Sequence, residues 1–126
     1  MISPPLPAQE EQRVQAIASY QILDTAPEPE YDQLVELATF ICETPIGLIS
    51  LVDRDRQWFK ASCGFDSTET SRQISFCAHA ILHPEVLIVE NCLEDLRFFD
   101  NPLVTGEEGV RFYAGAPVCW IADLVL

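Results

Sequence analysis

An apolar run followed by a charged turn is the feature that most constrains how this chain folds. Residues 46–52 are nearly all apolar, as expected of a central strand that is covered on both faces. The polar residues 53–56 then reverse the chain, and residues 57–63 form a returning strand. The pattern predicts a β-hairpin with Trp58 and Phe59 on opposite faces of its second strand. We expect one of these rings to lie in the core and the other to face outward, where it offers a surface to a partner.

Helical patterns flank this hairpin. A first short helix is expected from Glu10, a second from Glu30 to Thr44, and a third over residues 71–82. Short strands are expected over residues 86–89 and 112–118. The second helix carries an apolar stripe made of Tyr31, Leu34, Val35, Ala38, Ile41 and Cys42. Together these elements predict the α+β class, with one antiparallel sheet and helices packed on it.

The charge and the cysteines narrow the range of partners and compartments. The 126 residues suffice for one domain, and 7 basic against 20 acidic residues give a formal net charge of -13. Such an excess repels phosphate backbones and anionic lipid, so neither nucleic acid nor a membrane is expected as a partner. The N-terminus has no signal-peptide pattern, and the 5 cysteines include no C-x-x-C pair. We therefore expect a cytoplasmic protein with reduced thiols.

Four sequence blocks follow one another at fitting intervals, and they are Leu23-Asp-Thr-Ala-Pro-Glu28, Ser75-Phe-Cys-Ala-His79, the segment 95–102 and Arg111-Phe-Tyr-Ala-Gly-Ala-Pro117. In this order they resemble the GAF domain, a small-molecule-sensing module of signalling proteins. The resemblance is closest to the GAF domains near the N-terminus of bacterial sensor histidine kinases and diguanylate cyclases. It predicts a mobile lead over residues 1–9, an incomplete GAF domain over 10–118 and a non-matching tail over 119–126.

The resemblance also implies that the last strand or strands and the final helix of a GAF domain are missing. Their absence would leave unpaired backbone groups along a sheet edge near residues 46–52. Three outcomes stay open at this point. The tail from Trp120 to Leu126 can supply a substitute strand, two chains can pair, or the chain can fold poorly.

Six residues are candidates for binding a ligand between the sheet and the helices, namely Cys77, His79, Arg97, Asp100, Arg111 and Tyr113. In bilin-binding relatives, a cysteine on the corresponding helix holds a tetrapyrrole and a histidine follows it directly. Here Ala78 intervenes, and Cys77 falls on an apolar stripe with Ile74 and Ile81, which favours a core thiol.

The other candidates also have structural alternatives. Arg97 and Asp100 belong to a polar loop, and Asp100 can equally cap the turn that begins at Pro102. Arg111 and Tyr113 alternate along the last strand, so we expect them to leave one face together. His79 has the helical spacing of a metal pair with His83, but without a third ligand we expect no metal and no cofactor.

The chain carries no recognised catalytic motif. P-loop, Gly-x-Gly-x-x-Gly, His-Glu-x-x-His and Gly-x-Ser-x-Gly patterns are all missing from the sequence. We therefore expect a regulatory sensor module without catalysis of its own, which takes a small-molecule ligand and forms a homodimer through its first helix. The alternatives are an inactive fragment of a longer sensor kinase or cyclase, a GAF-type methionine sulfoxide reductase and a bilin-binding photoreceptor domain.

Overall fold

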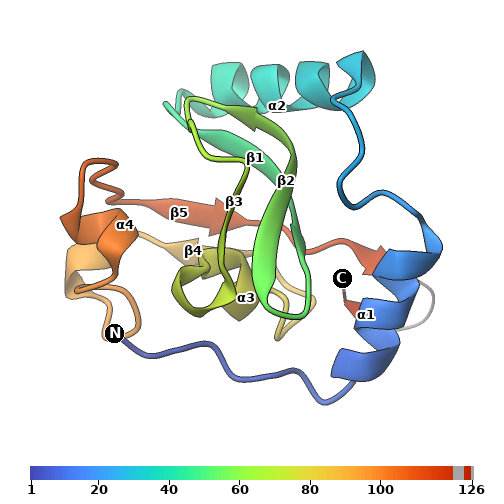
Figure 1. Cartoon of the computed structure of the whole chain (residues 1–126). Helices are drawn as coiled ribbons and strands as arrows, with labels where there is room; N and C mark the ends of the chain where they lie inside the picture. Colours follow the sequence, from blue (N-terminus) through green and yellow to red (C-terminus); the bar gives the residue numbers. More distant parts are fainter. Residues whose placement is uncertain (121–123, 126) are drawn as a thin grey trace.

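The chain folds as helices packed on antiparallel strands, which confirms the α+β class (Figure 1). A computed structural model describes residues 1–120 and 124–125. The elements are α1 Glu10–Ser19, α2 Pro29–Cys42, β1 Gly47–Val52, β2 Arg56–Cys63, β3 Glu69–Ser71, the 3-10 helix η1 Arg72–Ile74, α3 Phe76–Ala80, β4 Leu87–Val89, the 3-10 helix η2 Cys92–Glu94, α4 Pro102–Thr105, β5 Tyr113–Gly115, β6 Cys119–Trp120 and β7 Leu124–Val125. In the described part of the chain no helix has the length and apolar character needed to cross a membrane.

The predicted hairpin forms the centre of the largest sheet. β1 and β2 pair antiparallel, from Gly47 opposite Cys63 to Val52 opposite Gln57, and β3 pairs with the other edge of β2. The other described strands form two separate ladders, β4 with β5 and β6 with β7. The described strands are therefore divided among three sheets and do not form one, since β4 and β5 pair only with each other.

The second strand of the hairpin is buried on both faces. Trp58 and Phe59 are each 7% exposed, so the expectation that one of them faces outward is wrong. The register shifts between Ile49 and Ser50, which leaves Lys60 as an extra residue on β2 in a β-bulge. This bulge turns Lys60 into the interior, where its side chain is buried.

Two cations of β2 hold the loop between α1 and α2. Lys60 Nζ donates to Thr25 Oγ1 and pairs with Glu28 Oε2, each at 2.7 Å. Arg56 donates two hydrogen bonds to the Asp24 carboxylate, at 2.8 and 2.9 Å. The first of the four sequence blocks thus fastens both N-terminal helices to the sheet.

Helix α2 approaches β1 where that strand has no side chain. A Cβ added at Gly47 would lie 2.6 Å from Thr39 Cγ2 and 3.1 Å from Val35 Cγ1. This close contact turns the side of α2 that bears Val35 toward the sheet, where Val35 is 3% exposed. The predicted stripe was wrong in part, because Leu34 and Ile41 lie on the exposed side of the helix.

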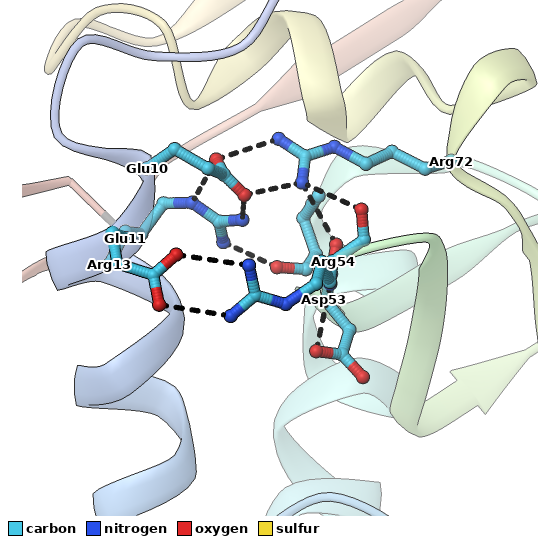
Figure 2. Close-up of polar contacts among 7 residues, drawn as sticks. Glu10, Glu11, Arg13, Asp53, Arg54 and Arg72 are labelled. Atoms are coloured by element: carbon cyan, nitrogen blue, oxygen red, sulfur yellow. Dashed lines mark hydrogen bonds and ion pairs between the residues drawn. The ribbon is translucent and has the colours of Figure 1, made fainter.

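Helix α1 is fixed to the turn between β1 and β2 by a buried charge network (Figure 2). The Glu10 carboxylate accepts hydrogen bonds from Arg72 at 2.6 and 3.0 Å and from Arg13 at 2.6 and 3.2 Å. Arg13 also donates to the carbonyl of Val52, and Arg72 donates to that of Asp53 at 3.0 Å. Burial acts to raise the pKa of Glu10, but the two arginines outweigh it and lower that pKa to about 2.

The third helix is shorter than the sequence predicted. Instead of one helix over residues 71–82, the chain forms the end of β3, then η1, then α3 over Phe76–Ala80. The reason is Ser75, which is extended and accepts a hydrogen bond from the Ala78 N–H at 3.0 Å, so that it begins a new helix as an N-cap. His83 consequently lies beyond the helix.

A second core lies between α3, the β4–β5 ladder and α4. Its buried members are Phe76, Val89, Cys92, Phe98 and Val104. The rings of Phe76 and Phe98 stack with their centroids 4.1 Å apart. This core holds the segment that contains Arg97 and Asp100 next to α3.

Among residues 1–120 and 124–125, β1 pairs only with β2, so its other edge is open. An open edge at this strand was expected from the sequence. β6 and β7 pair with each other, with Cys119 opposite Val125. The alternative of a substitute strand over 120–126 falls partly on residues 121–123 and 126, which lie outside the described ones.

We expect Gly47→Ala to lower the free energy of unfolding by about 1–3 kcal/mol, because the new Cβ collides with α2. Thr39→Ser removes the methyl group nearest to that Cβ, so the double variant should recover part of the loss. Urea denaturation of both single variants and the double variant measures this coupling. A double variant no more stable than Gly47→Ala would contradict it.

We expect Glu10→Gln to lower the free energy of unfolding by roughly 3 kcal/mol at pH 7, because two buried arginines lose their carboxylate. Glu11→Gln is the matched control, since Glu11 pairs with Arg54 at the surface and its loss should change stability little. Because the pKa of Glu10 is lowered in the fold, its contribution is present above pH 4.5 and is lost as the pH falls toward 2. Equal losses in the two variants on urea denaturation would refute the role given to Glu10.

Candidate functional site

A hollow of about 440 Å³ lies beside the C-terminal end of α3. Its lining is mostly apolar with four polar side chains, and it consists of Ile2, Pro5, His79, Ala80, Leu82, His83, Glu85, Val86, Leu87 and Arg97. This volume lies within the range of small-molecule sites. Of the six candidate residues, His79 and Arg97 line the hollow.

The N-terminal lead forms one wall of the hollow. The Ile2 N–H donates to the Arg97 carbonyl at 3.2 Å, and the Ile2 carbonyl accepts from His79 Nε2 at 3.1 Å. The Asp100 carboxylate forms an ion pair with the amino group of Met1. Three of the six candidates, His79, Arg97 and Asp100, are thus brought together around the lead.

His79 is held as a neutral donor. Its side chain is buried, and the edge-on contact with the ring of Phe98 has a centroid distance of 4.9 Å. Burial lowers the pKa of His79, and the hydrogen bond to the Ile2 carbonyl opposes this only in part. Because a carbonyl only accepts, the proton of the neutral ring lies on Nε2.

The charge of Arg97 is already matched within the protein. Its Nε and Nη2 donate to the two carboxylate oxygens of Asp95 at 3.0 and 2.8 Å. This bidentate pair raises the pKa of Arg97 and lowers that of Asp95. The hollow therefore offers a neutralised cation, which suits an uncharged ligand better than a strongly anionic one.

Cys77 and Tyr113 meet each other, but neither lines the hollow. The Tyr113 hydroxyl donates to Cys77 Sγ at 3.3 Å. The Ser50 hydroxyl lies 3.1 Å from the same sulfur and 3.2 Å from Gln57 Oε1, and Gln57 Nε2 donates to Thr70 Oγ1 at 3.0 Å. This line of polar groups crosses from β5 through α3 to the main sheet.

One residue in the sequence hints at this polar line, although its partners cannot be read from the sequence. Ser50 is the only hydroxyl residue within the apolar run of residues 46–52. Burial raises the pKa of the Cys77 thiol, and burial together with the neighbouring sulfur raises the pKa of Tyr113. A thiol held protonated is a poor nucleophile, which agrees with the interpretation of Cys77 as a core residue.

Arg111 is not brought to the other candidates. β5 begins only at Tyr113, so the expected alternation of Arg111 and Tyr113 along one strand is wrong. Arg111 Nη1 instead donates to the Val104 carbonyl at 2.8 Å, in the last turn of α4. Its role in the fold is to close that short helix.

The capping role expected of Asp100 belongs to its neighbour. Asn101 Oδ1 accepts from the Leu103 N–H at 2.9 Å as the N-cap of α4. Asn101 is 2% exposed, and its Nδ2 donates to the Ile74 carbonyl at 3.1 Å. Asn101 thereby links α4 to the segment before α3. Asp100 pairs instead with the amino group of Met1 in the N-terminal lead.

The histidine pair does not keep the spacing expected of it. α3 ends at Ala80, so His79 and His83 do not stand one helical turn apart. Among the residues that the structure describes, no group of three or more His, Cys, Asp or Glu side chains is placed to hold a metal.

We expect the imidazole of His79 to stay neutral and protonated on Nε2 when the pH is lowered just below 6.5, the ordinary pKa of histidine. Because folding lowers this pKa, the unfolded chain binds more protons in that window, and His79 makes the fold less stable as the pH falls. Long-range ¹H–¹⁵N spectra of a His83→Asn variant, in which His79 is the remaining histidine, report the protonation directly. A His79 ring that is already protonated on both nitrogens, and therefore positively charged, at pH 6.5 would contradict the expectation.

Sequence comparisons bear directly on this fold. The family model of the GAF domain matches residues 26–125. A cyclic di-GMP phosphodiesterase of Pseudomonas aeruginosa is 43% identical over 126 residues, which is 100% of this chain. The chain spans only 22% of the length of that relative. The family match extends over most of the helices and strands described above, and the chain therefore belongs to the GAF domain family.

Proposed function

We propose that this GAF domain is a regulatory sensor module that binds one small molecule in the hollow beside α3 and transmits the bound state through the N-terminal lead. The observation that carries the proposal is that the wall formed by Ile2 and Pro5 continues along the chain into α1. A ligand that favours one position of the lead shifts the population of lead positions at the N-terminal end of α1. No catalysis by the chain itself is part of this proposal.

The lining supports a small ligand with an apolar body and few polar groups. Leu82, Val86 and Leu87 supply apolar surface, and His83 and Glu85 supply hydrogen-bonding groups that point to specificity. Arg97 is paired with Asp95, so a multiply charged phosphate would find little uncompensated positive charge there. Purines and aromatic metabolites are the classes that fit this chemistry.

We further propose that the output under control is an enzyme of cyclic di-GMP turnover in the cytoplasm. The support is the 43% identity to a cyclic di-GMP phosphodiesterase, of which this chain spans 22%. That activity belongs to the relative as a whole. The sequence alone left a histidine kinase and a diguanylate cyclase open as the output, and this relative favours an enzyme of cyclic di-GMP turnover.

Pairing of two copies through α1, expected from the sequence, remains part of the proposal. The apolar residues Val14 and Ile17 of this helix are buried in its own fold. A dimer through α1 would therefore use the exposed side that bears Glu11, Gln12 and Gln15. Such a contact would be polar, and it would be sensitive to salt.

Isothermal titration with purines, cyclic nucleotides and aromatic metabolites tests the binding site. We expect one ligand class to bind at a single site and to shift the amide signals of Ile2, His79 and Arg97. Val86→Trp should weaken binding at least tenfold, because the larger ring fills the hollow.

Ile88→Trp is the matched control, since Ile88 is exposed to a similar extent and does not line the hollow. An equal loss of binding affinity in both variants, or weak binding of many unrelated ligands, would rule out a specific binding site. Failure of every class to bind would favour the inactive-fragment alternative.

A further inference from the structure

One residue of the N-terminal lead supplies the hydrogen-bond partners of two groups at the hollow. The Ile2 N–H donates to the Arg97 carbonyl at 3.2 Å, and the Ile2 carbonyl accepts from His79 Nε2 at 3.1 Å. Within residues 1–120 and 124–125, these are the hydrogen bonds that the Arg97 carbonyl and His79 Nε2 form. The lead thus presents a donor and an acceptor from one residue, as a bound molecule would.

Arg97 and His79 are positioned without the lead. The Arg97 N–H donates to Asp95 Oδ1 at 2.9 Å, and the Phe98 N–H donates to the Asp95 carbonyl at 3.0 Å, which closes a turn at these residues. His79 lies in α3, and its ring packs edge-on against Phe98. Residues 1–9, in contrast, contain no helix or strand. The domain therefore holds an acceptor and a donor in fixed positions, and the lead is the part that a ligand can replace.

The hollow is independent of the open sheet edge. Its lining residues lie between positions 2 and 97, and none of them belongs to β1, β6 or β7. The pairing of β1 therefore has no part in the contacts of Ile2, Arg97 and His79.

A cyclic amide carries the same pair of groups as Ile2. Its N–H can donate to the Arg97 carbonyl, and its neighbouring C=O can accept from His79 Nε2. Its ring can pack on the apolar part of the lining, to which Leu82 and Leu87 belong. A carboxylate has no donor for the Arg97 carbonyl, and an ammonium group has no acceptor for His79. A molecule that lacks either group would leave one of these partners without a hydrogen bond, which weakens binding.

We propose that Ile2 occupies part of the ligand site in the free domain, and that the ligand is an uncharged cyclic amide that displaces it. The amide donates to the Arg97 carbonyl and accepts from His79 Nε2, and the lead is released from the wall of the hollow. This inference rests on the proposed function, because it names the ligand class of that site and the way in which the lead responds to binding.

Three matched probes test the donor and the acceptor in the 126-residue chain. Oxindole carries the N–H and the C=O on a fused aromatic ring, N-methyloxindole lacks the N–H, and indole lacks the C=O. We expect isothermal titration to show that oxindole binds at least about tenfold more tightly than either of the other two.

The outcomes of this titration separate the inference from the proposed function. Equal affinity of the three probes would overturn the inference but would leave the binding site of the proposed function in place. A hollow that binds other compounds and not oxindole would have the same meaning. Failure of every compound to bind would overturn both.

The displacement of the lead is measured separately by ¹⁵N relaxation. At saturating oxindole, we expect the order parameter of the Ile2 N–H to fall below about 0.6, the range of a flexible backbone. The Phe98 N–H, which donates to the Asp95 carbonyl, is the control and should keep its order parameter. If oxindole binds and the order parameter of Ile2 stays the same, the proposed displacement is wrong.

Two substitutions of His79 test the donor. His79→Phe keeps a ring against Phe98 but has no N–H, so it should abolish the preference for oxindole over indole. Because this preference compares two bound states, it does not depend on how firmly the lead is held in the free domain. His79→Gln retains a side-chain N–H group and should keep part of the preference.

Circular dichroism checks that both variants fold. An unchanged preference in folded His79→Phe would refute the role given to His79. If His79→Phe does not fold, the three probes and the order parameter of Ile2 in the unsubstituted chain still decide the proposal.

Discussion

The carboxylate of Glu10 holds two buried guanidinium groups at once, and the position of α1 depends on it. A single negative charge faces the positive charges of Arg13 and Arg72, so the network keeps an excess of one positive charge. Backbone carbonyl oxygens at the turn between β1 and β2 accept the other hydrogen bonds of these two arginines. Since an unpaired buried charge costs several kcal/mol, this set forms only when α1, the turn and η1 meet.

The segment before α1 therefore has one strong and one weak attachment. At Glu10 the chain is fixed by buried ion pairs, whereas near its start it is held by two hydrogen bonds of Ile2 and by a partly exposed ion pair between Met1 and Asp100. Single neutral hydrogen bonds contribute roughly 1 kcal/mol each to stability. In the proposed function, a ligand in the hollow would compete with the weak attachment and leave the strong one in place. The lead can change position while α1 stays folded.

Local patterns in the sequence predicted the elements that depend on near neighbours. The hairpin and the two N-terminal helices follow from periodicity and from helix-end preferences, whereas the cap of α4 was expected at Asp100 and lies at Asn101. Serine is a preferred N-cap residue, but the helical spacing of Ile74, Cys77 and Ile81 runs across Ser75. That spacing predicted one helix where η1 and α3 are separate.

Contacts between distant residues could not be predicted in this way. Arg72 and Glu10 are 62 positions apart, and Lys60 and Thr25 are 35 positions apart. Nothing in the composition of either segment marks these cations as buried, because most arginines and lysines lie at the surface. For the same reason the sequence did not show that Arg111 lies outside the strand that begins at Tyr113. The start of β5 is set by pairing with β4 and not by the residues themselves.

The hollow and the Glu10 network differ in how their charges are matched. At the hollow, Arg97 is paired with Asp95 and His79 is neutral, so shape and apolar contact would decide what the proposed site binds. At the network, one carboxylate faces two guanidinium groups, and backbone carbonyls of the fold accept their other hydrogen bonds. In a chain with a net charge of -13, the cations near the hollow and near α1 are thus matched within the fold, which leaves little uncompensated positive charge for an anionic ligand.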